Sequence, residues 1–138
     1  MEARVSLIIS SKQLVAEANE LINTLSLDDA HSKLNDDMVQ FVDIRDVREL
    51  EREGMIPGAF HAPRGMLEFW IDPDSPYFKP IFGEHKLFVF YCQSAWRSAL
   101  ATAAVQRMGL DHVCHIAGGF GVWKKAGFEV AEKVPSKT

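Results

Sequence analysis

Cysteine is scarce in this sequence: only Cys92 and Cys114 are present, which excludes a small fold held together by several disulfide bonds. Free thiols persist in reducing compartments, whereas secreted proteins usually oxidise them in pairs. We therefore expect a cytoplasmic protein whose stability comes from an ordinary hydrophobic core.

Long apolar runs are also lacking. The apolar run that follows Met1 is too short for the core of a secretory signal sequence, and no small-residue cleavage site comes after it. No other stretch approaches the roughly 20 apolar residues that a membrane-spanning helix needs. The sequence therefore predicts neither a secretory signal nor a membrane partner.

Positive charge is not in excess either. The chain has 15 lysines and arginines against 19 aspartates and glutamates, which gives a formal net charge of −4. The basic residues are scattered and form no stripe, so we expect no nucleic-acid partner. With 138 residues, 47% of them hydrophobic, the chain has room for one domain with a single core and none for a second.

What the sequence does contain is an alternation of short apolar runs and helical patterns. The apolar runs are typical of buried strands, and no turn dipeptide joins two of them as a hairpin would. This order predicts an α/β fold, a central parallel β-sheet with helices on both faces. We expect the domain at residues 22–130, preceded by a helical extension packed on it at residues 1–21 and followed by a flexible tail at residues 131–138.

One stretch stands out as a candidate for chemistry. Residues 87–91 are five apolar residues in succession, and they end at Cys92, which opens a tight loop before a helical pattern. Ser94 and Ser98 are candidate caps for that helix. Loop N–H groups and a helix N-terminus favour a thiolate at this position, and Arg97 adds a full positive charge. Cys92 is our candidate nucleophile, although a cysteine at a strand end is also often a simple core residue.

A pair of charged residues lies at the end of another apolar run, residues 38–43. Asp43 and Arg45 lie where this strand is expected to end, the edge at which open α/β sheets usually place their sites. Two roles are open for them. They border the Cys92 loop, or they hold neighbouring loops together as a hydrogen-bonded charge pair.

Three motifs in this chain resemble those of the rhodanese family, and specifically of its single-domain sulfurtransferases. They occur in the order that the family has, at residues 41–46 with Glu49 and 54–59, at residues 92–97, and at residues 118–128. The resemblance covers about residues 22–130. It implies the rhodanese-like fold, which agrees with the parallel sheet that the strand pattern predicts.

The resemblance also implies roles for individual residues. In the family the loop cysteine carries a persulfide, which makes Cys92 the catalytic residue, and by analogy Asp43 and Arg45 then support the loops. The side chains and amides implied to bind the substrate are those of Gln93, Ser94, Ala95, Trp96, Arg97 and Ser98. We expect no cofactor and no metal.

The expected function is that of a sulfurtransferase. Cys92 takes a sulfane sulfur from a small-molecule donor such as thiosulfate or another persulfide, and passes it to cyanide, a thiol or a protein acceptor. Ala95 stands where many relatives have glycine, so a positive φ there carries strain. Two roles stay open for Arg97: it binds an anionic donor, or it holds the loop in place. Trp96 lies beside the nucleophile or folds back onto the helix.

Two other classes of protein compete with this interpretation. Phosphatases and arsenate reductases of related fold use a loop one residue longer, with five residues between cysteine and arginine, to wrap a tetrahedral oxyanion. Here four residues separate Cys92 from Arg97, which favours a single sulfur atom. The other class is a non-catalytic rhodanese-like binding or regulatory module, and modules of that kind commonly lack the cysteine.

The second cysteine has no assigned function. Cys114 lies in the last expected strand, residues 111–116, and we expect it to be buried and inert. A disulfide with Cys92 is a question of geometry that the sequence leaves open. His112 and His115 lie close to Cys114 in sequence, but neighbours on a strand point to opposite faces, so we expect no metal site.

Overall fold

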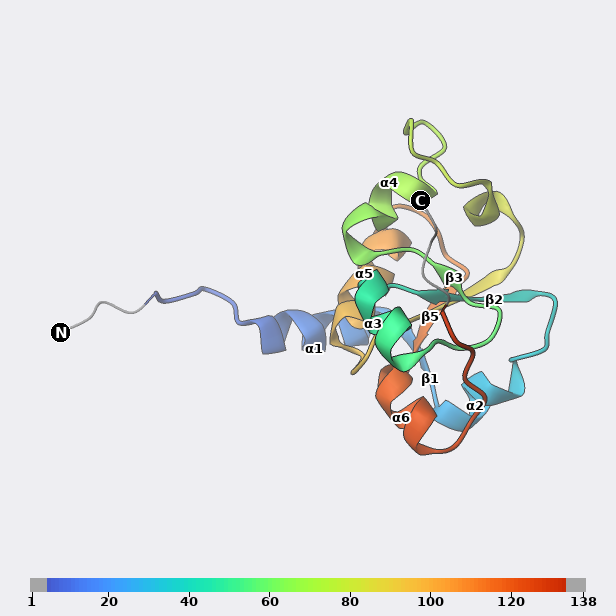
Figure 1. Ribbon diagram of the computed structural model, residues 1–138. Coiled ribbons are helices and arrows are strands. Elements are labelled where there is room, and N and C mark those ends of the chain that lie inside the picture. Colours follow the sequence, from blue (N-terminus) through green and yellow to red (C-terminus); the bar gives the residue numbers. More distant parts are fainter. Residues whose placement is uncertain (1–4, 134–138) are drawn as a thin grey trace.

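The computed structural model describes residues 5–133 and contains the expected parallel sheet (Figure 1). Five strands pair in the order β1-β5-β4-β2-β3, and every pairing is parallel. The strands are β1 (Asn23–Leu25), β2 (Val39–Asp43), β3 (Phe60–His61), β4 (Leu87–Tyr91) and β5 (Val113–Ile116). The predicted fold class is confirmed.

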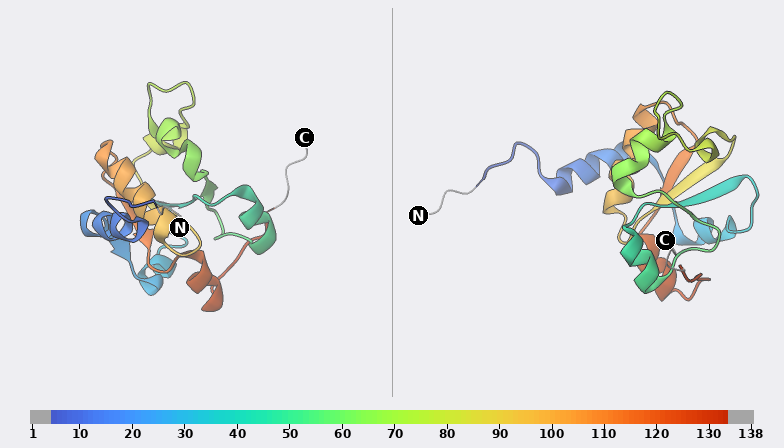
Figure 2. Two further views of the ribbon diagram at one scale, coloured as in Figure 1. Left: turned by 90° about the vertical axis from the view of Figure 1, so that its left-hand side faces the viewer. Right: turned by 45° about the horizontal axis from the view of Figure 1, so that its top comes forward.

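Helices cover both faces of this sheet (Figure 2). One face packs against α4 and α5, the other against α2 and α6, and α1 lies outside α5. None of the helices in the described part of the chain is long and apolar enough to cross a membrane. The bounds are α1 (Ser11–Leu21), α2 (Leu27–Ser32), α3 (Val47–Glu53), α4 (Leu67–Ile71), α5 (Trp96–Arg107) and α6 (Gly119–Lys125), with short 3₁₀ turns at Arg64–Met66 and Pro80–Gly83.

The central strand β4 is apolar throughout because both of its faces are buried. Phe88 and Phe90 pack in the core on the α5 face, whereas Val89 and Tyr91 pack in the core on the α6 face. In the register of β2 and β4, Asp43 lies opposite Tyr91. The residues that follow these two strands therefore emerge side by side at the carboxyl edge of the sheet.

The two ends of the chain behave differently from each other. As expected, α1 packs on the domain, where Ala18 and Ile22 contact Ala99 of α5. At the other end the pairing continues past residue 130, because Ala131 and Met55 exchange two backbone hydrogen bonds of 2.9 and 2.8 Å. Of the residues 131–138 that we expected to form a flexible tail, Ala131 is therefore paired, and residues 134–138 lie outside the described residues.

Candidate active site

Cys92 lies directly after β4 and is almost completely buried, with 1% of its surface exposed. The backbone N–H of Ser98, in the first turn of α5, donates a hydrogen bond to Cys92 Sγ at 3.3 Å. Such a donor stabilises sulfur more when it is charged than when it is protonated, because a thiolate is the stronger acceptor. The loop thus presents a hydrogen-bond donor to the expected nucleophile.

The start of α5 differs from our expectation. The helix begins at Trp96, and neither Ser94 nor Ser98 caps it, because the N-cap position is Ala95, whose side chain has no polar atom. Ala95 has φ 71° and ψ 3°, the left-handed conformation that costs an alanine about 1–2 kcal/mol. The sequence indicated only that a positive φ at this position would carry strain. This conformation turns the short loop into the helix and brings the Ser98 N–H to the sulfur.

Arg97 braces the loop against α3. Its Nη1 and Nη2 donate to the two carboxylate oxygens of Glu49 at 2.9 and 3.0 Å, a bidentate pair across 48 residues of sequence. The hydrogen bond from Arg97 lowers the pKa of Glu49, and the same bond raises the pKa of Arg97, with a smaller contribution from Cys92. Of the two roles left open by the sequence, the bracing contact is the one that the structure contains.

Asp43 and Arg45 form the charge pair that the sequence suggested, and both side chains are fully buried. Arg45 donates to both Asp43 oxygens, at 3.0 Å from Nε and 2.7 Å from Nη2. It also donates to Gln93 Oε1 at 3.1 Å and to the Gly54 carbonyl at 2.7 Å. Burial lowers the pKa of Arg45, but the hydrogen bond and charge of Asp43, together with the charges of Tyr91 and Glu49, raise that pKa above its usual value. The pair therefore ties the Cys92 loop to the end of β2.

The paired glycines at the start of α6, Gly118 and Gly119, bring this helix against the Cys92 loop, a contact that sequence reasoning missed. The N–H groups of Phe120 and Gly121 donate to the carbonyls of Cys92 and Gln93 at 2.8 and 3.0 Å. Gly119 has φ 69°, and a Cβ atom placed there would lie 2.5 Å from the Cys92 carbonyl oxygen. Only glycine permits this approach, and the two adjacent glycines were the signal for it.

A buried histidine behind the loop was also missed. His115 Nδ1 lies 2.8 Å from Ser98 Oγ, and its Nε2 lies 3.1 Å from both Asn19 Oδ1 and Thr24 Oγ1. Burial lowers the pKa of His115 to about 4, so the ring is neutral at pH 7. The imidazole therefore connects β5, α1 and β1 to the residue whose N–H contacts Cys92. In the sequence this residue was considered only as a neighbour of Cys114 in the last strand.

We expect this histidine to make stability fall in mild acid. In the unfolded chain the histidine takes up a proton near pH 6.5, whereas in the folded protein it does so only near pH 4. The free energy of unfolding therefore decreases as the pH falls between these values. The shift corresponds to about 3 kcal/mol at pH 4. Urea unfolding of wild type and His115→Gln at pH 7, 6, 5 and 4 measures it. Parallel pH curves for the two proteins would contradict the prediction.

The remaining loop side chains are more open. Ser94 is exposed, and Trp96 has 69% of its surface exposed, so its ring is not folded back into the core. It lines an apolar hollow with Val15 of α1 and Leu100 of α5. A substrate or partner that approaches the loop from this side meets an indole ring.

Cys114 lies on the opposite side of the sheet from Cys92. It packs in the core on the α6 face, whereas Cys92 packs on the α5 face, and both thiols are free. A disulfide between them is therefore absent. Burial raises the pKa of Cys114 to about 11, which keeps this thiol protonated and inert, as expected.

Comparisons with known proteins agree with this architecture. A family model for the rhodanese-like domain matches residues 26–126. A solved structure of a protein of unknown function and possible tyrosine phosphatase from Rhodopseudomonas palustris is 51% identical, with a TM-score of 0.91, and covers 94% of this chain and 100% of that one. No curated protein matches the chain significantly.

Two solved sulfurtransferases are more distant relatives. The polysulfide-sulfur transferase homodimer of Wolinella succinogenes is 26% identical, with a TM-score of 0.66, over 88% of this chain and 87% of that one. A human single-domain sulfurtransferase is 29% identical, with a TM-score of 0.61, over 74% and 95%. The matched family model, the parallel sheet and the cysteine loop at its carboxyl edge together establish that this chain belongs to the rhodanese-like domain family.

Proposed function

We propose that this protein is a sulfurtransferase that works through a persulfide on Cys92. The observation that carries the proposal is the placement of the Cys92 thiol in a short loop whose following helix donates the Ser98 N–H to the sulfur at 3.3 Å. The relatives named as sulfurtransferases support the reaction class. The reducing cytoplasm is the compartment that suits a free reactive thiol.

The first half-reaction loads the enzyme. The Cys92 thiolate attacks the outer sulfur of a donor, a new S–S bond forms, and the bond between that sulfur and the rest of the donor breaks. With thiosulfate the electron pair leaves on sulfite. The product is a Cys92 persulfide whose terminal sulfur is anionic, and the preorganised N–H groups of the loop stabilise that charge.

The second half-reaction returns the thiolate. An acceptor such as cyanide or a thiol attacks the terminal sulfur, and the S–S bond breaks with its electron pair on Cys92. Cyanide then leaves as thiocyanate, and a thiol leaves as a persulfide. No proton transfer to the enzyme is required, which agrees with a loop that has no general base among its side chains.

The side chains around the loop favour a donor other than a multiply charged anion. Positions 93–96 are uncharged, and the Arg97 guanidinium is already paired with Glu49 through two hydrogen bonds. The loop therefore offers thiosulfate little positive charge, because its one cation is already paired with a carboxylate. A persulfide donor, whose terminal sulfur carries at most one negative charge, is the better match, with a thiol or protein acceptor.

A phosphatase is the second candidate, because the 51% identical relative is named a possible tyrosine phosphatase. That chemistry needs a loop that surrounds a tetrahedral oxyanion and a cation that contacts its oxygens. Here four residues separate Cys92 from Arg97, whose guanidinium contacts a carboxylate. The loop therefore favours sulfur. A binding module without catalysis is the third alternative.

Mass spectrometry of the intact protein tests the proposal directly. Wild type, Cys92→Ser and the matched control Cys114→Ala are incubated with thiosulfate or with a polysulfide, and cyanide is then added. We expect a gain of one sulfur on wild type and Cys114→Ala, its removal by cyanide with release of thiocyanate, and no gain on Cys92→Ser.

Three outcomes would overturn the proposal. Sulfur bound equally well by Cys92→Ser would show that the reactive group lies elsewhere. No gain from either donor, together with Cys92-dependent hydrolysis of an aryl phosphate, would establish the phosphatase. No turnover in either assay would leave the binding module.

A further inference from the structure

The first turn of α5 carries the N–H group that faces Cys92, yet this turn has no side-chain cap of its own. The N-cap residue Ala95 has no polar side-chain atom and takes a positive φ of 71°. A helix start without a side-chain cap leaves its first N–H groups without a local acceptor, and the one from Ser98 donates to Cys92 Sγ. The direction of this hydrogen bond therefore depends on the contacts that other elements make with the turn.

Two polar side chains of this turn reach other elements. Arg97 pairs with Glu49 of α3, and 43% of the Arg97 side chain is exposed. Ser98 has no exposed surface, and its Oγ lies 2.8 Å from Nδ1 of His115, a buried residue of β5. The buried contact belongs to the same residue whose N–H faces the sulfur. A change in the bond between Ser98 and His115 therefore acts directly on the hydrogen-bond donor to Cys92.

The second ring nitrogen of His115 determines which way this bond runs. His115 Nε2 lies 3.1 Å from Asn19 Oδ1 and 3.1 Å from Thr24 Oγ1. An amide oxygen accepts hydrogen bonds and donates none, so Nε2 carries the proton of the neutral ring and Nδ1 is an acceptor. In the other tautomer, Nε2 and the amide oxygen would be two acceptors in contact. The Ser98 hydroxyl group therefore donates its hydrogen to Nδ1.

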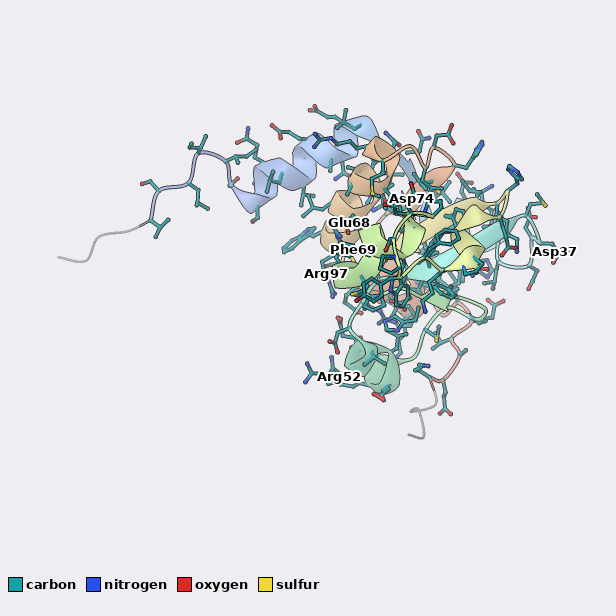
Figure 3. All side chains as sticks on the ribbon, turned by 90° about the horizontal axis from the view of Figure 1, so that it is seen from above. Asp37, Arg52, Glu68, Phe69, Asp74 and Arg97 are labelled. Carbon is teal, nitrogen blue, oxygen red and sulfur yellow. The ribbon has the colours of Figure 1, made fainter. Side chains whose placement is uncertain are left out.

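We propose that His115 is a positioning residue for Cys92, and that Asn19 of α1 supports it by selecting the tautomer. This role rests on the proposed function, since it assigns both residues to the reactivity of the Cys92 thiolate. Helix α1 lies along α5 (Figure 3), and Asn19 and Thr24 both precede residues 26–126, the range that the family model matches. A segment outside the matched range thus helps to hold the catalytic loop of this chain.

The positioning role predicts a specific change in the reactivity of Cys92. A donor held toward the sulfur favours the thiolate over the thiol, so a loosened turn lowers the share of thiolate at pH 7. At pH 10 a thiol with the ordinary pKa of about 8.5 is ionised without such help. A less acidic thiolate is also a better nucleophile, which offsets about half of the effect on the logarithm of the rate. A roughly tenfold smaller thiolate share, the order expected when one hydrogen bond to a charged group is lost, thus slows the reaction about 3-fold.

Alkylation of Cys92 by iodoacetamide at pH 7 and pH 10 tests this role without any sulfur donor. Every protein carries Cys114→Ala, which leaves Cys92 as the one cysteine of the chain. We expect His115→Phe and Ser98→Ala to react about 3-fold more slowly than the parent at pH 7, and no more slowly at pH 10. Because both substitutions remove the same bond, the double variant should be no slower than either single variant. His115→Asn, which keeps a polar atom close to the position of Nδ1, should recover most of the rate at pH 7.

A pair of surface substitutions tests the part played by α1 without a change in the core. Asn19 and Glu20 are both exposed neighbours on α1, and within the described residues the Glu20 side chain makes no hydrogen bond or ion pair. We expect Asn19→Leu to slow alkylation at pH 7 about 2-fold, since Thr24 is left as the partner of Nε2. The matched control Glu20→Leu should react at the parent rate at both pH values.

Three results would overturn the proposal. Equal rates for all variants at pH 7 would show that His115 does not act on Cys92. An equal fall at pH 7 and pH 10 would show a general loss of structure in place of positioning, and equal rates for Asn19→Leu and Glu20→Leu would exclude the support from α1. If alkylation follows the prediction but Cys92 takes up no sulfur from any donor, the sulfurtransferase assignment fails while the positioning role holds.

Discussion

Replacement of Asp43 by asparagine is expected to cost about 3–5 kcal/mol of unfolding free energy, since it leaves a buried arginine without its charge partner. Arg45 and Asp43 have no exposed surface and share three hydrogen bonds of 3.2 Å or less between their side chains. Asparagine keeps the shape of the aspartate but removes the negative charge. The guanidinium then stays buried with neutral acceptors, the amide oxygen of the new side chain, Gln93 Oε1 and the Gly54 carbonyl, and the nearest carboxylate is that of Glu53 at 3.6 Å.

Urea unfolding at pH 7 measures this loss, and the neighbouring Arg48 provides the control. Arg48 forms an ion pair with Asp46 at 3.2 Å, but its side chain is 82% exposed, so Arg48→Met is expected to change stability by less than about 1 kcal/mol. The double variant Asp43→Asn/Arg45→Met should lose less than the sum of the two single variants, because neither leaves an unpaired charge once both are changed. Equal losses for Asp43→Asn and Arg48→Met would contradict the buried pair.

The sequence could predict those features of the fold and the site that depend on local patterns of residues. The parallel sheet followed from apolar runs separated by helices. The start of α3 also depends on local sequence, since Asp46 and Glu49 form a capping box within four residues. The position of Cys92 at the end of a buried strand also needed only residues 87–92. Each of these inferences depends on neighbours in sequence, where spacing and conformation are closely linked.

What the sequence could not predict is contact between distant segments. Glu49 was named only as part of a motif, yet in the structure it completes the cap of α3 and also binds Arg97, 48 residues away. His115 was one position in a strand, and its three polar neighbours come from three other elements. The left-handed start of α5 at Ala95 displaced the expected serine caps, because the loop turns toward Cys92 before the helix begins. Such contacts depend on the relative placement of elements, which periodicity does not encode.

Because Gly119 packs directly against the Cys92 loop, Gly119→Ala is the most informative substitution for function. A Cβ atom at this position would lie 2.5 Å from the Cys92 carbonyl oxygen and 2.8 Å from that of Gln93, so the loop or α6 must move. The positive φ adds about 1 kcal/mol, and displacement of two packed backbones raises the expected loss of stability to about 3 kcal/mol. Because the hydrogen bonds from Phe120 and Gly121 hold the same carbonyls, we expect the rate of sulfur transfer to fall at least 10-fold at temperatures where the variant is folded.

Gly127 at the other end of α6 separates the two effects of this substitution. It has φ 82° and open space where a Cβ would lie, so Gly127→Ala introduces backbone strain without a clash. We expect Gly127→Ala to lose about 1 kcal/mol of stability and to keep the wild-type rate of persulfide formation. If both variants lose the same stability and neither loses rate, then close packing of α6 against the loop does not set the geometry around Cys92. If only Gly119→Ala is slow, the paired glycines belong to the catalytic loop as much as the residues between Cys92 and Arg97 do.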